Sequence, residues 1–125
     1  HHPAEILSTV FAAKEKFPRQ KICMIFEPHR FTRTQQLFDD FIKVLSKVDF
    51  LLLLDIYPAS ENPIQGISSK KLASQILKNH KNVHYMGKKD PMNWLQENHK
   101  DFSILITQGA GTISKLNKKI QKKWQ

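Results

Sequence analysis

The chain has 125 residues, of which 40% are hydrophobic and 10% aromatic. This length and composition predict one globular domain with a substantial apolar core. The single cysteine excludes a disulfide framework and a cysteine-based metal site. No apolar run approaches the roughly 20 residues of a membrane-spanning helix, and no signal peptide is evident at the N-terminus, so we expect a reducing, cytoplasmic setting without a membrane.

The formal net charge of +9 comes from one half of the chain. Residues 1–62 carry eight basic and eight acidic side chains, whereas residues 63–125 carry twelve lysines and three acidic side chains. Surfaces that bind nucleic acid usually add arginines and exposed aromatic side chains, and this half has no arginine. Solvated helix faces are therefore favoured over a surface for RNA.

Along the whole chain, segments whose apolar residues have helical spacing alternate with continuous apolar runs of strand length. Pro3 suits the first position of a helix, and Pro18 ends that helix. The predicted elements are a helix over 4–17, a strand over 21–27, a helix over 35–47 capped by Thr34, a strand over 49–56, a loop over 57–67, a helix over 69–79 capped by Ser68, a strand over 83–86, a helix opened by Asp90 and Pro91, a strand over 102–107 and a helix over 112–123. This order predicts a doubly wound, mostly parallel, Rossmann-like α/β sheet with helices on both faces.

The segment Pro28-His29-Arg30-Phe31-Thr32-Arg33-Thr34 directly follows the first predicted strand. In an open α/β sheet, ligands bind in the crevice beyond the carboxyl ends of the strands. Arginine presents a planar fork of donors that matches a carboxylate or a phosphate. The segment therefore indicates a bound anion, and a solvated basic loop is the alternative interpretation.

Two further polar loops follow strands and should share the same edge of the sheet. They carry Asp55, Tyr57, Ser60 and Glu61, and then Thr107, Gln108, Gly109, Ala110 and Gly111. Glycines after a strand let the backbone approach a ligand, and a helix N-terminus favours anions. A lone Gly-Ala-Gly turn also serves plain strand–helix packing, and neither glycine motif for phosphate binding is complete. Asp55 is either a catalytic carboxylate or a structural cap, and the structural role is favoured.

Taken together, these motifs resemble a known family. The matching segments are His-His-Pro at 1–3, the block at 28–34, Leu-Phe-Asp-Asp-Phe at 37–41, Leu-Leu-Leu-Asp-Ile-Tyr at 52–57 and Thr-Gln-Gly-Ala-Gly at 107–111. They are similar, over essentially all 125 residues, to the C-terminal domain of the Mur ligases that join L-alanine to UDP-N-acetylmuramate. Domains of that family open with Asp-Asp-Tyr-Gly-His-His-Pro. The paired histidines therefore match a motif, which disfavours the alternative that they are the remnant of an affinity tag.

The resemblance implies that residues 1–125 form the C-terminal, amino-acid-binding domain of a three-domain, ATP-dependent ligase for peptidoglycan synthesis. Such an enzyme cleaves ATP to ADP and phosphate and forms the amide through an acyl phosphate. The resemblance further implies that UDP-N-acetylmuramate is bound by an N-terminal domain, and that ATP and Mg²⁺ are bound mainly by a central domain. The fragment alone should then be inactive. The alternative is a free-standing basic α/β module that binds RNA or another polyanion.

The family also implies roles for residues of the first loop. Arg30 and Arg33 match the arginines that hold the carboxylate of alanine. His29 stands beside them and is the candidate catalytic residue, because the attacking amine must lose a proton and an imidazole can accept it.

The resemblance also implies roles for four further residues, because they match functional positions of the family. His1 and His2 match residues on the nucleotide side of the cleft, and Gly109 and Gly111 should shape the wall near the amino acid. The chain departs from the family pattern in two ways: the upstream Asp-Asp-Tyr-Gly is missing, and lysines replace acidic residues in the second half. No metal ligand is expected within this chain.

Overall fold

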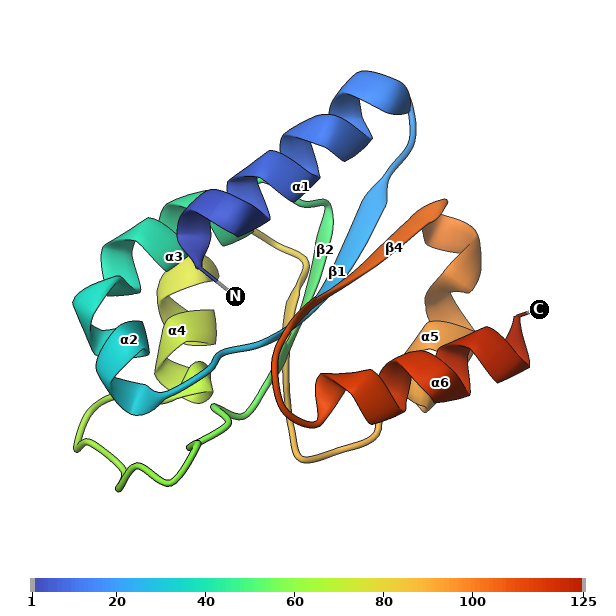
Figure 1. Cartoon of the computed structure of the whole chain (residues 1–125). Coiled ribbons are helices and arrows are strands. Elements are labelled where there is room, and N and C mark those ends of the chain that lie inside the picture. Colours follow the sequence, from blue (N-terminus) through green and yellow to red (C-terminus); the bar gives the residue numbers. More distant parts are fainter. Residues whose placement is uncertain (1, 125) are drawn as a thin grey trace.

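A parallel sheet of four strands forms the centre of the computed structural model, which describes residues 2–124 (Figure 1). The strands are β1 (Ile22–Glu27), β2 (Phe50–Leu54), β3 (Val83–Gly87) and β4 (Ile104–Gly109), in the spatial order β3-β2-β1-β4. The helices are α1 (Pro3–Lys16), α2 (Phe31–Gln36), α3 (Phe38–Leu45), α4 (Ser69–Ile76), α5 (Met92–Asn98) and α6 (Ile113–Lys123), and a short 3-10 helix η1 (His99–Asp101) follows α5. The predicted doubly wound α/β fold is confirmed.

Helices cover both faces of the sheet, with α1, α3 and α4 on one side and α5 and α6 on the other (Figure 1). Alternate residues of β1 serve the two sides: Met24 and Phe26 join the first cluster, whereas Cys23 and Ile25 join the second. Every residue of β1 is buried, because β2 and β4 flank it and both of its faces are covered. Burial raises the pKa of the Cys23 thiol to about 12, so this cysteine is an apolar core residue.

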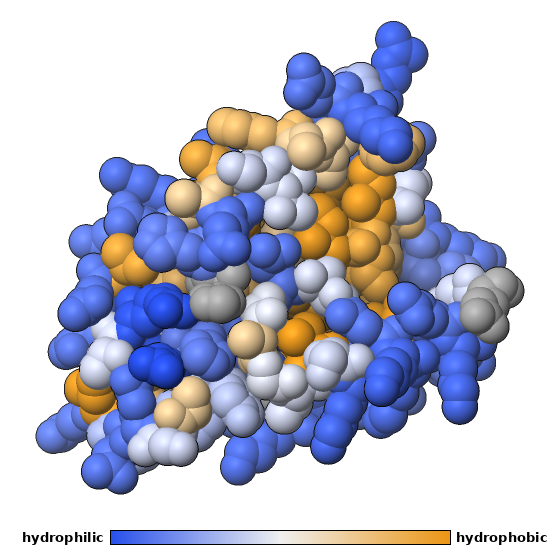
Figure 2. Space-filling model, in the orientation of Figure 1, coloured by the Kyte–Doolittle hydropathy of each residue, from blue (hydrophilic) through white to orange (hydrophobic). Residues whose placement is uncertain are grey.

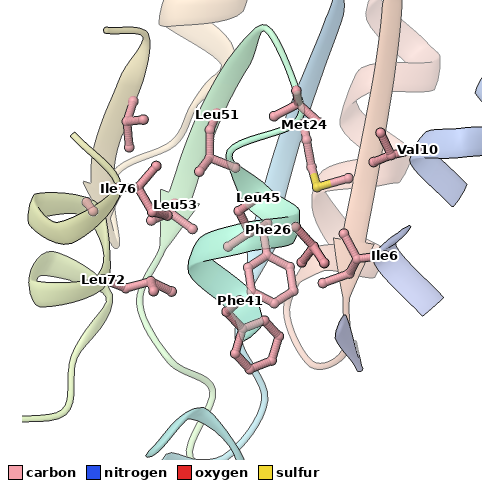
Figure 3. Close-up of a cluster of buried hydrophobic side chains, with 14 of the residues drawn as sticks. Ile6, Val10, Met24, Phe26, Phe41, Leu45, Leu51, Leu53, Leu72 and Ile76 are labelled. Carbon is pink, nitrogen blue, oxygen red and sulfur yellow. The ribbon is translucent and has the colours of Figure 1, made fainter. Parts of the chain in front are cut away.

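The larger core lies between the sheet and α1, α3 and α4 (Figure 3). Ile6 of α1, Phe41 of α3 and Leu72 of α4 belong to one cluster with Phe26, and the Phe26 and Phe41 ring centroids are 5.5 Å apart. Burying each such side chain stabilises the fold by about 1.5–3 kcal/mol. The end of β1, which carries the candidate loops, is thereby fixed in a rigid layer.

The hydrophobic core on the opposite side of the sheet, under α5 and α6, contains fewer buried residues. Leu95 and Leu116 are buried there, while Trp94 and Phe102 stack with ring centroids 6.1 Å apart and stay partly exposed. The edge strand β4 is only half-buried along its length, and Figure 2 shows apolar side chains at the surface in this region. No helix within residues 2–124 is long and apolar enough to cross a membrane.

The prediction of one helix over residues 35–47 is wrong, because the structure has two helices here and the first of them begins earlier. The chain enters α2 already at Phe31 and breaks at Leu37 (φ −111°) before α3 begins. Thr34 is not an N-cap: it is buried inside α2, and its hydroxyl donates a hydrogen bond to the Arg30 carbonyl oxygen at 2.8 Å. A threonine hydroxyl can bond to the carbonyl four residues back as well as to a helix start, so its presence alone did not locate the boundary.

The predicted cap at Ser68 is confirmed, because its hydroxyl accepts a hydrogen bond from the Lys71 N–H at the start of α4. Asp90 was predicted as the N-cap of the next helix with Pro91 as its first residue, but Pro91 is itself the N-cap of α5 and Asp90 lies one residue before it. The Asp90 carboxylate still accepts a hydrogen bond from the Met92 N–H. β4 continues to Gly109, two residues beyond the predicted end, because it pairs with β1 as far as Glu27.

Candidate functional site

Loops that follow β1 and β2 are joined beyond the ends of the strands. The Tyr57 N–H donates to the Pro28 carbonyl oxygen at 2.8 Å, and the Arg30 N–H donates to the Tyr57 carbonyl oxygen at 2.8 Å. The two loops thus continue the parallel pairing of the sheet, and the His29 ring stacks on the Tyr57 ring with centroids 5.7 Å apart. We call residues 29–34 the arginine turn; its start is fixed to the β2–α4 loop.

Two glycines pack the end of β4 against β1 and the loop that follows β4 against the β2–α4 loop. A Cβ atom on Gly109 (φ +135°) would lie 2.4 Å from the Glu27 carbonyl oxygen. A Cβ atom on Gly111 (φ +97°) would lie 2.5 Å from the Cγ atom of the Tyr57 ring. Only glycine fits such positive φ angles and close approaches. The three loops that the sequence predicts at one edge of the sheet are therefore brought together.

The arginine turn presents two cationic side chains, and neither forms an ion pair with an acidic side chain among residues 2–124. Arg30 has a φ of +73°, which is strained for a residue with a Cβ atom, and its side chain is exposed. Arg33 is half-buried, and one buried guanidinium nitrogen finds no hydrogen-bond partner among residues 2–124. Strongly hydrophilic side chains gather over α2 in Figure 2. An anion placed here would satisfy donors that the described chain leaves open.

His29 lies against this cationic pair. Burial lowers the pKa of His29 most, and the charges of Arg30 and Arg33 lower it further, whereas the Glu61 carboxylate acts in the opposite direction. A lowered pKa keeps the imidazole uncharged at neutral pH. The ring can therefore accept a proton beside a site suited to anions.

Glu61 reaches the arginine turn from the β2–α4 loop. Its carboxylate accepts a hydrogen bond from the Thr32 N–H at 3.1 Å and another from the Thr32 hydroxyl at 2.6 Å. These two bonds hold the pKa of Glu61 below its ordinary value. The sequence placed Glu61 on this edge of the sheet but gave it no role.

Glu27 is a buried carboxylate that the sequence interpretation missed. It accepts hydrogen bonds from the Thr112 hydroxyl and from the Ile113 N–H, the latter at 3.1 Å, and so caps α6 from the end of β1. Burial raises the pKa of Glu27 against the lowering effect of these bonds. The available signal was one acidic residue at the end of an otherwise apolar strand.

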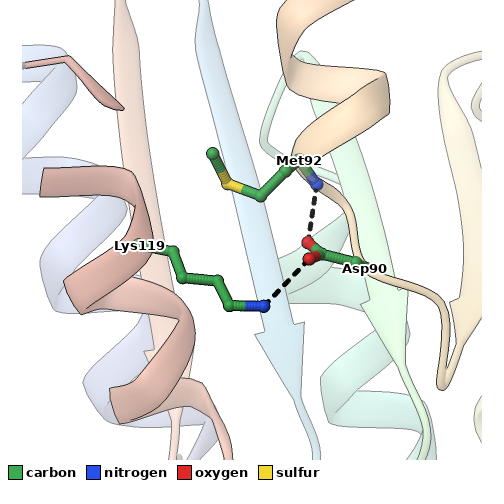
Figure 4. Close-up of polar contacts among 3 residues, drawn as sticks. All are labelled: Asp90, Met92 and Lys119. Carbon is green, nitrogen blue, oxygen red and sulfur yellow. Dashed lines mark hydrogen bonds and ion pairs between the residues drawn. The ribbon is translucent and has the colours of Figure 1, made fainter. Parts of the chain in front are cut away.

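A cleft of about 460 Å³ opens next to Glu27, between the β2–α4 loop, the β3–α5 loop and α6. Glu27, Tyr57 and Thr112 line it together with four lysines that we call the lysine rim: Lys88, Lys89, Lys115 and Lys119. Lys119 pairs with Asp90 at 3.0 Å, and Asp90 also accepts the Met92 N–H (Figure 4). The sequence analysis did not predict this cleft, because its walls come from four separate segments.

The remaining predicted residues have structural partners or lie outside the description. The His2 Nδ1 accepts the Ala4 N–H at 3.2 Å and the His2 N–H donates to Glu5, so His2 is the N-cap of α1. Asp55 accepts a hydrogen bond from the Tyr85 hydroxyl of β3, which is a structural contact but not the predicted helix cap. His1 lies outside the described residues. Residues 2–124 contain no cluster of three or more metal-ligating side chains.

Comparisons with known proteins agree with this architecture. The family model described as "Mur ligase, glutamate ligase domain" matches residues 1–111. A UDP-N-acetylmuramate–L-alanine ligase of Blochmanniella floridana is 44% identical over 120 residues, covering 94% of this chain and 25% of that protein. The enzymes of the same name from Psychrobacter arcticus and Psychrobacter cryohalolentis are each 44% identical over 117 residues, covering 93% of this chain and 24% of each protein. The chain thus spans about a quarter of the length of these relatives.

Proposed function

The chain belongs to the Mur ligase family, and on that premise we propose that it is the C-terminal, amino-acid-binding domain of an ATP-dependent UDP-N-acetylmuramate–L-alanine ligase. Relatives of that name match nearly the whole chain. The proposed reaction joins L-alanine to the lactyl carboxylate of UDP-N-acetylmuramate in the cytoplasm, during peptidoglycan synthesis. Residues 1–125 would then act only together with the N-terminal and central domains.

The arginine turn is the observation that carries this proposal. It lies beyond β1, next to the point where the strand order reverses between β1 and β4, which is where doubly wound sheets bind ligands. Arg30 and Arg33 have no ion-pair partner within residues 2–124, and Arg33 keeps a buried donor open. A strained backbone at Arg30 persists only where surrounding contacts impose it. The guanidinium groups of Arg30 and Arg33 can each donate two parallel hydrogen bonds to a carboxylate such as that of alanine.

The chemistry that follows is mainly one of positioning. With the alanine carboxylate held by Arg30 and Arg33, the amine has a fixed direction of attack on an acyl phosphate. His29, kept uncharged by burial and by the two arginines, would accept a proton from the ammonium group. Gly109 and Gly111 would form the adjoining wall.

ATP and Mg²⁺ are proposed for the full-length enzyme, with His1 and His2 near the nucleotide. Residues 2–124 offer no cluster of metal ligands, and the sequence has no phosphate-binding loop. We therefore assign the phosphate and magnesium contacts to the central domain and derive no step through the metal from this chain. No observation favours the RNA-binding alternative.

The proposal is tested by kinetics of the full-length ligase. Arg33→Ala and Arg30→Ala each remove a charge-assisted hydrogen bond worth about 1.5–3 kcal/mol, so kcat/KM for alanine should fall roughly 10- to 150-fold. Arg19→Ala, at an exposed arginine away from the site, is the matched control and should have no effect. Unchanged alanine kinetics in both site variants would contradict the assignment.

A direct test uses the 125-residue chain itself. In a nuclear magnetic resonance titration with L-alanine, and then with ADP, we expect amide shifts around residues 29–34 and 108–112. Shifts spread over the lysine-rich surface instead would indicate non-specific anion binding. Absence of shifts at millimolar ligand would mean that the site requires the central domain, and the arginine variants would then decide.

A further inference from the structure

Helix α2 is capped by a residue that lies far from it in the sequence. The backbone N–H groups at a helix start lack intrahelical partners, and Arg30, at the N-cap position of α2, makes no side-chain cap bond. Glu61 takes that place, because its carboxylate accepts both the N–H and the hydroxyl of Thr32. The carboxylate also stands at the positive end of the helix, where a negative charge is favourable.

The β2–α4 loop is bent in a way that brings Glu61 to this position. The Glu61 N–H donates to the Pro58 carbonyl oxygen at 3.0 Å, closing a turn over Ala59 and Ser60. Ala59 (φ +50°) and Ser60 (φ +72°) both adopt left-handed backbone angles, which L-residues avoid at a cost. The loop thus contains backbone strain that is compatible with its role of holding the carboxylate against Thr32.

Thr32 stands between the two arginines in the chain, on a helix of only six residues. A helix this short has little stability of its own and depends on its contacts. The Glu61 bonds act on Thr32, and Glu61 itself makes no ion pair with either arginine within residues 2–124. Glu61 therefore holds the start of α2 without neutralising either guanidinium group by a direct contact.

We propose that Glu61 is the positioning residue of the amino-acid site: it anchors the start of α2 through Thr32 and so sets where Arg30 and Arg33 meet the substrate carboxylate. This inference rests on the proposed function, and it adds that the β2–α4 loop controls the affinity for the amino acid. Glu61 acts through Thr32 and does not touch the substrate.

Two substitutions at Glu61 separate the contact from the charge. In Glu61→Gln, the amide oxygen can accept the Thr32 N–H and the amide nitrogen can donate to the Thr32 hydroxyl oxygen, so the anchor survives without the charge. Glu61→Ala removes both bonds. In the full-length ligase we expect Glu61→Ala to raise KM for alanine roughly 5- to 100-fold, while KM for ATP changes less than about twofold, and Glu61→Gln to restore most of the loss.

Thr32 provides an independent test if Glu61→Ala fails to fold. Thr32→Val keeps the N–H bond and loses the hydroxyl bond, and it should raise KM for alanine several-fold, whereas Thr32→Ser keeps both and should behave as wild type. Glu97→Gln, at an exposed glutamate on α5, is the control for removing a surface charge. It should change neither KM.

The outcomes distinguish this inference from the proposed function. If Arg33→Ala weakens alanine binding but Glu61→Ala or Thr32→Val does not, Glu61 is not a positioning residue. Equal increases in the KM values for alanine and ATP, with a lowered Tm, would assign Glu61 a merely structural role and also overturn the inference. If neither Arg33→Ala nor Glu61→Ala affects alanine, the proposed function itself fails.

Discussion

The arginine turn and the lysine rim lie at the same edge of the sheet and carry the same sign of charge, but they differ in how firmly they are held. Two backbone hydrogen bonds, the Glu61 carboxylate and a stacked ring pair fix the arginine turn. In the lysine rim, Lys119 and Asp90 form the one ion pair that the described residues show, with side chains 62% and 48% exposed.

This difference is the reason why we propose the arginine turn, and not the lysine rim, as the binding site. Exposed ion pairs contribute about 0–1 kcal/mol, and a lysine ammonium on a flexible stem is not oriented by its neighbours. In the arginine turn the backbone that carries the two arginines is already ordered before a ligand arrives, so less ordering entropy is lost on binding. The three predictions below test this contrast, from the largest expected effect to the smallest.

The support beneath the arginine turn should be the most sensitive element. Gly109→Ala places a Cβ atom against the Glu27 backbone, so a steric clash adds to the conformational cost of about 1–3 kcal/mol. The matched control is Gly66→Ala, which also has a positive φ but meets only the Lys71 Nζ at 3.9 Å, and which should cost about 1–2 kcal/mol. Urea unfolding measures both. Equal losses would show that the loops are not tightly joined.

Glu27 lies at the boundary between the two basic regions, and its titration should be visible in the stability. Since burial raises its folded pKa, protonated Glu27 stabilises the fold at low pH, and this contribution is lost as the pH rises through the folded pKa. Glu27→Gln keeps both cap bonds without ionising, so its stability relative to wild type should increase from pH 4 to pH 7.

The control for this experiment is Glu27→Ala, which removes the cap. It leaves the Ile113 N–H without its partner and should cost about 1–3 kcal/mol at low pH. Because this variant also lacks the ionising group, its cost relative to wild type should decrease as the pH rises. Urea unfolding at several pH values would measure both variants. A wild type and a Glu27→Gln variant with parallel pH profiles would refute the raised pKa.

The smallest effect is expected at the lysine rim. Replacing Lys88, Lys89 and Lys115 together by alanine should leave KM for alanine within about twofold and stability within about 0.5 kcal/mol for each substitution. A rise in KM comparable with that of Arg33→Ala would place the cleft within the amino-acid site and remove the contrast between the two regions.

The fold and the location of the candidate site were predictable because each depends on local patterns. Continuous apolar runs marked β1 and β2 as strands covered on both faces. The position of two arginines directly after β1 was sufficient to place them at the carboxyl edge. The roles of His29, Arg30 and Arg33 stay predictions until the kinetic tests are made.

The details that the sequence did not provide all depend on distant contacts. Thr34 looked like a helix start, because nothing local shows that Glu61 caps α2 from 29 residues away. Likewise, Glu27 caps α6 across 86 residues of chain, and the cleft beside it exists only once four segments have packed. Hydrophobic periodicity indicates which face of a helix or strand is buried, but it does not indicate which distant residue caps that element or packs against it.

The strand order also determines when the site can form during synthesis. β1 lies between β2 and β4, yet β4 and α6 leave the ribosome after the other described elements. A nascent chain therefore carries both arginines early, while Glu27 still lacks Thr112 and Ile113, and the Tyr57 ring still lacks Gly111. Since domains fold largely as units, the arginine turn acquires its full support only when residues 104–124 dock. Chains truncated before β4 should therefore fail to form the proposed amino-acid site.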